Sequence, residues 1–220
     1  MNRLYFLIFL IFIACNRIQK IEDYQKKVVL ENLEGELKYF YFHDSLIEQV
    51  SETKNGKIQG RVIQFYPNGK IRRKFFINKF DDKVGDETFF DNNGIITEHT
   101  FSLTSEQLLF CAKFSNKGKL IEKDGFPYFI QGRSVAKVGD TIKFYIAAPI
   151  IPGFKTNVEF YEDSDLSTGI NYINDIRQYK YRYVVNIKKN LEFDLVINIK
   201  DSLNNTVVKH KEKINVEVVE

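Results

Sequence analysis

The sequence contains no tryptophan, one methionine, two cysteines and three histidines among its 220 residues. No two of the histidines, His43, His99 and His210, lie within four residues of each other, so the His-x-x-x-His spacing of a metal site is absent. Each histidine lies in or beside an expected strand, among polar residues. We therefore expect exposed histidines and no metal site.

Signatures of catalysis are also missing. The sequence has no Gly-rich phosphate loop and no Gly-x-Ser-x-Gly nucleophile motif. The acid pairs at residues 81–82 and 86–87 are adjacent on expected strands or turns, where neighbouring side chains point apart. Two distant carboxylates could still converge, as in a glycosidase. We expect no catalytic residue, no cofactor and a non-enzymatic function, and an enzyme acting on glycans is the least favoured hypothesis.

The charge is almost balanced, with 32 Lys and Arg residues against 29 Asp and Glu residues. Phosphate-driven binding requires a large, concentrated positive field, so this balance argues against a nucleic-acid partner. Phenylalanine (20 residues) and tyrosine (12 residues) are abundant, and isoleucine and valine are frequent. Such a composition favours strands over helices and predicts an all-β protein.

The N-terminus carries a short apolar segment. Residues 4–14 form an apolar run of eleven residues after the single basic residue Arg3, whereas a helix that crosses a bilayer needs roughly 20. A basic start, a short apolar core and a small residue before the cleavage point are typical of a secretory signal peptide. We therefore assign residues 1–14 to a signal peptide and the polar residues 15–30 to a tether between membrane and domain.

The residue after the expected cleavage point is Cys15, and this end of the chain resembles a bacterial lipoprotein signal. The resemblance implies that Cys15 is lipid-modified and anchors the mature protein. Phe12 stands where that family usually has leucine. An ordinary signal peptide with an incidental cysteine, or an uncleaved anchor, is the alternative. In the lipidated form Cys111 has no partner for an internal disulfide, and we interpret it as a small apolar residue.

A repeat with a period of 25 residues organises the next part of the chain. Residues 60–69 (GRVIQFYPNG) recur as residues 85–94 (GDETFFDNNG). A diverged copy precedes them at residues 35–44, and a second follows at residues 110–118, displaced by one residue. A fixed period of this length indicates stacked supersecondary units.

Each repeat is predicted to be a β-hairpin, because a strand-forming segment is followed by residues that reverse the chain. The predicted turn residues are Asp44, Asn68, Gly69, Asn93, Gly94, Asn116 and Gly118. A single hairpin is marginally stable, so we expect residues 31–124 to form one long, twisted antiparallel sheet. Strand alternation should put Arg73 on one face and Arg72 and Lys74 on the other, which makes this basic cluster a solvated edge.

A glycine, an aromatic pair, Asn-Gly-Lys and a mixed return strand follow one another in residues 60–76, and residues 35–122 contain related copies, of which residues 85–94 are the nearest. This pattern resembles the bacterial variant of the MORN repeat, which occurs in proteins labelled YwqK-type antitoxin components and in many bacterial surface lipoproteins. The resemblance implies a fold unit and only weakly a function.

The period ends near residue 125, and six or seven short alternating strands follow in residues 125–220. This pattern predicts an antiparallel β-sandwich. It resembles the immunoglobulin-like domains of bacterial surface proteins, with residues 138–142 (VGDTI) leading into the second strand, although no cysteine pair or core tryptophan is present. The apolar loop at residues 147–154 (AAPIIPGF) is expected to pack against the neighbouring domain, and a binding lip is the alternative.

Together these features favour a lipid-anchored protein of the bacterial cell envelope, in the outer membrane or at the cell surface rather than in the inner membrane. We expect it to bind or scaffold a protein or glycan partner. The exposed aromatic residues of the array form the candidate binding surface: Tyr39, Tyr41, Tyr66 and Phe89. An antitoxin or immunity protein that neutralises a partner toxin is the alternative hypothesis.

Overall fold

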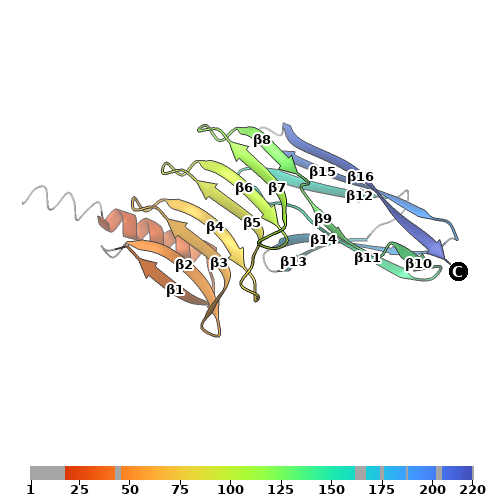
Figure 1. Cartoon of the computed structure of the whole chain (residues 1–220), viewed down its shortest axis with the longest axis horizontal. Coiled ribbons are helices and arrows are strands. Elements are labelled where there is room, and N and C mark those ends of the chain that lie inside the picture. Colours follow the sequence, from red (N-terminus) through yellow and green to blue (C-terminus); the bar gives the residue numbers. More distant parts are fainter. Residues whose placement is uncertain are drawn as a thin grey trace, which may run out of the picture.

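The computed structural model describes residues 18–42, 46–161, 167–173, 176–186, 188–201 and 205–219. The predicted signal peptide, the lipidation residue Cys15, the turn residue Asp44 and His43 lie outside the described residues. The described residues form sixteen strands and one helix, which confirms the all-β prediction (Figure 1).

Residues 36–125 form a single antiparallel sheet in which eight strands are paired in chain order. The strands are β1 (Glu36–Tyr41), β2 (Ile47–Lys54), β3 (Lys57–Phe65), β4 (Ile71–Ile77), β5 (Lys83–Phe90), β6 (Ile96–Ser102), β7 (Leu108–Phe114) and β8 (Leu120–Gly125). The predicted array of hairpins that pair edge to edge is therefore confirmed.

The turns that close β3–β4, β5–β6 and β7–β8 share one geometry. Gly69, Gly94 and Gly118 have φ angles of 81°, 85° and 71°, a region that suits glycine because it has no Cβ. In each turn the glycine N–H donates to the carbonyl three residues earlier, at 2.8–2.9 Å. Neighbouring turns are also joined, because the Asn68 side chain donates to the carbonyl of Asn92 at 2.8 Å.

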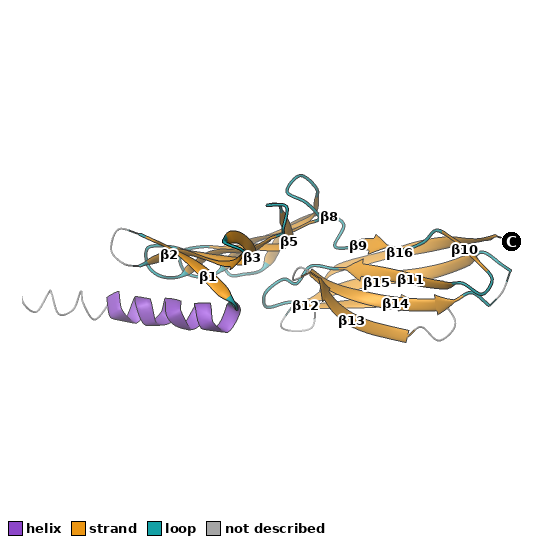
Figure 2. Ribbon diagram, turned by 90° about the horizontal axis from the view of Figure 1, so that it is seen from below, coloured by secondary structure: helices purple, strands orange, loops and turns teal. Residues whose placement is uncertain are grey.

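Residues 18–32, most of which lie in the segment predicted to be a tether, form a helix, here called the N-terminal helix. The helix lies along one face of the array (Figure 2). Val28 and Val29 lie on its buried face and, with Leu33 just after the helix, enter a core that includes Ile47, Val50, Ile63 and Phe65 of the array. Burial of this apolar stripe stabilises the helix, which the mostly polar composition of the segment did not predict.

A fully buried polar residue also fixes the N-terminal helix to the sheet. The Gln25 side chain donates from Nε2 to the Ile47 carbonyl at 2.8 Å and accepts the Ile47 N–H at 3.0 Å. Gln25 therefore completes the backbone pairing at the start of β2, in the way that a neighbouring strand would.

The second half of the chain forms two four-stranded sheets. Its strands are β9 (Phe129–Gln131), β10 (Val135–Lys137), β11 (Thr141–Ala147), β12 (Lys155–Tyr161), β13 (Ser167–Ile173), β14 (Ile176–Val184), β15 (Leu191–Lys200) and β16 (Thr206–Val219). One sheet has the order β13-β14-β11-β9, and the other has the order β10-β16-β15-β12, with β10 parallel to β16.

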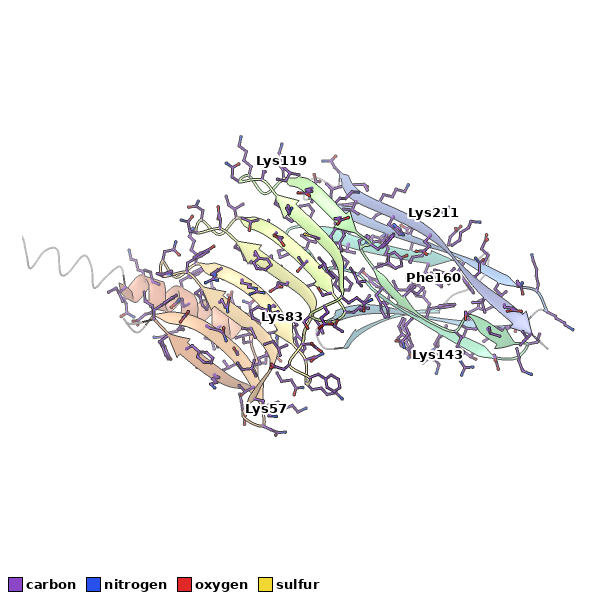
Figure 3. The ribbon with its side chains drawn as sticks, in the orientation of Figure 1. Lys57, Lys83, Lys119, Lys143, Phe160 and Lys211 are labelled. Atoms are coloured by element: carbon purple, nitrogen blue, oxygen red, sulfur yellow. The ribbon has the colours of Figure 1, made fainter. Side chains whose placement is uncertain are left out.

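These two sheets share an aromatic core. The ring of Phe144 on β11 lies 5.0 Å from that of Phe160 and 5.1 Å from that of Phe193, between centroids. Phe160 lies between the sheets, whereas Lys143 and Lys211 point outward (Figure 3). The alternation of buried and exposed residues along β11 matches the sequence pattern that predicted it.

The array and the second unit are packed on each other. One buried cluster contains Phe110 and Phe114 of β7 together with Ala148 and Ile151 of the loop between β11 and β12. The ring of Phe154 in the same loop lies 5.4 Å from that of Phe114. The prediction that this loop packs against the neighbouring domain is confirmed.

Candidate functional site

A continuous cross-strand row of side chains runs across the face of the array that carries the N-terminal helix. It consists of Val50, Ile63, Lys74, Thr88, His99 and Ala112, each paired with the next in register. Val50 and Ile63 lie in the core shared with the helix, and Ala112 lies in the core shared with the second unit. The polar middle of the row, from Lys74 to His99, therefore lies between the two covered regions.

A pocket of about 290 Å³ lies over this middle part, and we call it the junction pocket. Three parts of the chain line it: the end of the N-terminal helix, strands β3 to β5, and the loop after β11. The lining residues are Asn32, Leu33, Arg61, Val62, Ile63, Lys74, Phe75, Phe76, Val84, Asp86, Thr88, Ile150 and Pro152. Its volume is at the lower limit of ligand-binding pockets, which are about 300–1,000 Å³ and often lie between domains.

His99 closes one side of this region and is fully buried, so the prediction of an exposed histidine is wrong for this residue. Its Nδ1 lies 2.9 Å from the Thr88 hydroxyl, and its Nε2 lies 2.9 Å from Oδ1 of Asp86. An ionised carboxylate can only accept, so this pairing places a proton on Nε2. Both ring nitrogens are satisfied, as burial requires.

Asp86 connects the array to the second unit. Its Oδ1 also accepts the backbone N–H of Ile150 at 2.9 Å, across 64 residues of sequence. The neighbouring Glu87 pairs with Arg73 on the opposite face of the sheet, as the alternation of the adjacent acids predicted. Asp86 thus fixes the loop after β11 against β5 and places a carboxylate on the pocket wall.

Lys74 supplies a positive charge on the other side of the pocket. Its ammonium donates to Oδ1 of Asn32 at 2.7 Å, and Asn32 in turn donates to the carbonyl of Val28 at 2.8 Å. Burial lowers the pKa of Lys74, and the nearby Glu31 carboxylate opposes that shift. Within the described residues Lys74 has no salt bridge.

The expected split of the basic cluster is correct, but its expected position is wrong. Arg73 and Lys74 point to opposite faces, yet β4 is an interior strand between β3 and β5 and not an edge. The Arg73 guanidinium lies 4.7 Å from the ring centroid of Phe75 and 4.8 Å from that of Phe89. Arg73 is therefore held by stacking and by Glu87 instead of being solvated.

The four candidate aromatic residues do not form one surface. Tyr39 and Tyr41 lie together on the edge strand β1, with ring centroids 6.2 Å apart and side chains 40% and 56% exposed. The Tyr66 hydroxyl donates to the Phe90 carbonyl at 2.8 Å and so connects adjacent hairpins. Phe89 is the cross-strand partner of Arg73 and lies on the face away from the N-terminal helix. Tyr39 pairs with Val50 and lies on the opposite face.

The predicted turn residues in the described part of the chain all lie at the same end of the strands of the array. Asn68, Gly69, Asn93, Gly94, Asn116 and Gly118 occupy the turns that close β3–β4, β5–β6 and β7–β8. Their hydrogen bonds maintain the turns, as when Asn93 N–H donates to Oδ1 of Asp91 at 2.9 Å. These residues shape the array and do not line the junction pocket.

Sequence reasoning missed the residues of the junction pocket, although the repeat offered a signal. Arg61 and Asp86 occupy the same repeat position, and so do Lys74 and His99, since each pair is 25 residues apart. Comparison of the copies would have shown chemically unlike polar residues at positions on one face of the sheet. Only the packing of the helix and of the loop shows that this face is covered.

Other kinds of site are not found in the described part of the chain. No group of three or more His, Cys, Asp or Glu side chains there could hold a metal ion. No helix among the same residues has the length and apolar character needed to span a membrane. Comparison with models of protein families and with curated proteins found no match to this chain.

Proposed function

We propose that this protein is a non-catalytic binding or scaffolding protein of the bacterial cell envelope, anchored by a lipid on Cys15. The short basic and apolar start of the chain supports the location. The junction pocket supports the binding role and is the observation on which the proposal depends. It is concave, lies between two packed units and presents one basic side chain, Lys74, and one acidic side chain, Asp86, which hydrogen bonds hold in place.

We further propose that the array is MORN-like and that the second unit is immunoglobulin-like. The four successive hairpins and their equivalent turns support the first assignment. Labelling β9 and β11 to β16 as strands A to G gives the orders D-E-B-A and G-F-C in the two sheets, with the short strand β10 added beside G. This agreement with the constant-type immunoglobulin topology supports the second assignment.

The location can be tested by growing the full chain with a clickable fatty-acid analogue and fractionating the cells. We expect label on the wild type in the outer-membrane or surface fraction and no label on Cys15→Ala. A wild-type chain that stays unlabelled, or one recovered from the cytosol with its first fourteen residues attached, would refute the location.

The binding role can be tested by cross-linking in intact envelopes followed by capture of the full chain. Ile150→Trp should fill the junction pocket while keeping the backbone N–H that Asp86 accepts. Ile121→Trp, at a position 67% exposed and absent from the pocket lining, is the matched control. We expect Ile150→Trp alone to lose the captured molecule, and equal capture by both variants would refute the pocket's role. Capture of a toxin, with rescue of growth on co-expression, would instead favour the antitoxin or immunity alternative.

A further inference from the structure

Two opposite charges line the junction pocket without pairing with each other. The described hydrogen bond of the Lys74 ammonium goes to the neutral amide of Asn32. Asp86 accepts from His99 and from the Ile150 backbone through Oδ1, and no described residue donates to its Oδ2. The salt bridges among the described residues include none between Lys74 and Asp86.

The sheet register explains why these charges are close but separate. Lys74 pairs with Thr88, and Asp86 lies two residues before Thr88 on the same face of β5. The β4–β5 register shifts between Lys74 and Phe76, so Asp86 has no direct partner on β4. Lys74 turns toward the end of the N-terminal helix, and Asp86 turns toward the loop after β11. The pocket therefore has a positive wall on the helix side and a negative wall on the side of the second unit.

The rest of the lining is mainly apolar. Ile63, Phe76 and Val84 supply the sheet side, and Ile150 and Pro152 supply the loop side. Arg61 also lines the pocket, but its guanidinium lies 2.7 Å from the Glu52 carboxylate, which compensates its charge. A volume of about 290 Å³ holds on the order of ten water molecules, which suits a small molecule.

Lys74 has no salt bridge among the described residues, and His99 contacts only Oδ1 of Asp86, which leaves Oδ2 without a described donor. A partly buried charge that is incompletely paired is costly, and a ligand that supplies the missing partner relieves that cost. An isolated anion would be attracted by Lys74 but repelled by Asp86. An isolated cation would be attracted by Asp86 but repelled by Lys74. A ligand that carries both charges satisfies both walls at once. Burial lowers the pKa of Lys74 by more than the nearby Glu31 carboxylate raises it, which agrees with an ammonium that has no salt bridge.

We propose that the junction pocket binds a small zwitterion of the α-amino-acid type. Its carboxylate would contact Lys74, its ammonium would contact Asp86, and its apolar side chain would pack on Phe76, Val84 and Ile150. This inference rests on the proposed binding function and names the ligand class for that site.

The test is calorimetric titration of the purified full chain with three probes of the same shape. L-Leucine carries both charges, N-acetyl-L-leucine lacks the ammonium, and L-leucinamide lacks the carboxylate. We expect L-leucine to bind and each analogue to bind at least tenfold more weakly. This comparison requires no variant, so it does not depend on whether a substituted chain folds.

Variants then assign each charge to its residue. Lys74→Met should weaken L-leucine binding at least tenfold and remove the preference for L-leucine over L-leucinamide. Asp86→Asn keeps an oxygen for the Ile150 N–H and should remove the preference over N-acetyl-L-leucine. Lys113→Met is the control, because Lys113 is exposed and pairs with Glu122 away from the pocket.

Absence of binding by L-leucine and by a panel of the other apolar amino acids would overturn the proposal. Equal binding of all three probes, or L-leucine binding that Lys74→Met and Asp86→Asn leave unchanged, would overturn it as well. Neither result bears on lipid labelling or on envelope capture, so failure of this inference is distinguishable from failure of the proposed function.

Discussion

Replacement of Gly69 by alanine tests the seating of the N-terminal helix. Gly69 has a φ of 81°, and a Cβ at this position would overlap Cγ2 of Ile21 on the helix. Gly94 is the matched control because its φ is 85°, but its Cβ would have only Lys70 Cδ nearby, at 3.7 Å. Both substitutions strain the backbone equally, and only one displaces the helix.

The expected magnitudes follow from these two contributions. A non-glycine residue at positive φ costs roughly 1–2 kcal/mol, which should be the whole effect of Gly94→Ala. Gly69→Ala adds the cost of overpacking a fitted contact, about 1–3 kcal/mol. For a chain of this size each kcal/mol lowers Tm by about 2–4 °C. Gly69→Ala should therefore melt several degrees below Gly94→Ala.

A double-mutant cycle isolates the contact itself. In an Ile21→Ala background the atom nearest to the new Cβ is the Cβ of residue 21, at 3.4 Å, so the overlap disappears. The total destabilisation caused by Gly69→Ala should then equal that caused by Gly94→Ala. Both values are measured by urea denaturation followed by circular dichroism. Equal costs of the two glycine substitutions in the wild-type background would refute the described position of the helix.

Three further outcomes are expected. Gln25→Leu leaves the buried N–H and carbonyl of Ile47 without the partners that the glutamine amide supplies. It should lower the free energy of unfolding, measured in urea, by about 2–5 kcal/mol. A change within about 0.5 kcal/mol would contradict this. Asp86→Ala removes the acceptor for Ile150 and should speed proteolysis in the loop after β11, whereas Asp86→Asn should not; equal rates would contradict the role of this bond. Burial raises the pKa of Tyr181 to about 12, above its unfolded value near 10. Its contribution to stability is therefore present below pH 10 and lost as the pH rises toward 12, and Tyr181→Phe should reduce this alkaline decline in Tm; an unchanged decline would contradict it.

The hairpin array was predictable because its information is local. The Asn-Gly turns, the aromatic residue four positions before each turn and the fixed period all specify neighbouring strands, and these pair in chain order. The N-terminal helix was missed for the opposite reason. Its buried face includes Gln25, whose amide replaces a strand partner for Ile47, and no rule of composition marks a glutamine as a core residue.

The candidate site was missed because burial on a sheet face depends on what covers it. His99 lies two residues before Phe101 in β6, so both side chains point to the face that the loop after β11 approaches. The sequence shows this alternation but not the covering loop, which lies about 50 residues further along the chain. Asp86 and Ile150 are likewise brought together only by the tertiary fold. Long-range packing, rather than any local pattern, creates the junction pocket.

If Cys15 carries the proposed lipid, the docked N-terminal helix limits how the molecule can be oriented on a bilayer. Three peptide units separate Cys15 from Ile18, and a fully extended chain of that length spans at most about 11 Å. The helix and the second β unit lie at opposite ends of the long axis (Figure 1). A lipid on Cys15 would thus be joined to the folded part of the protein by a very short linker. The folded part would therefore move as a rigid body about its point of attachment. The second β unit would then reach only a limited range of positions above the headgroups. Lengthening the segment before Ile18 would widen that range without altering the fold.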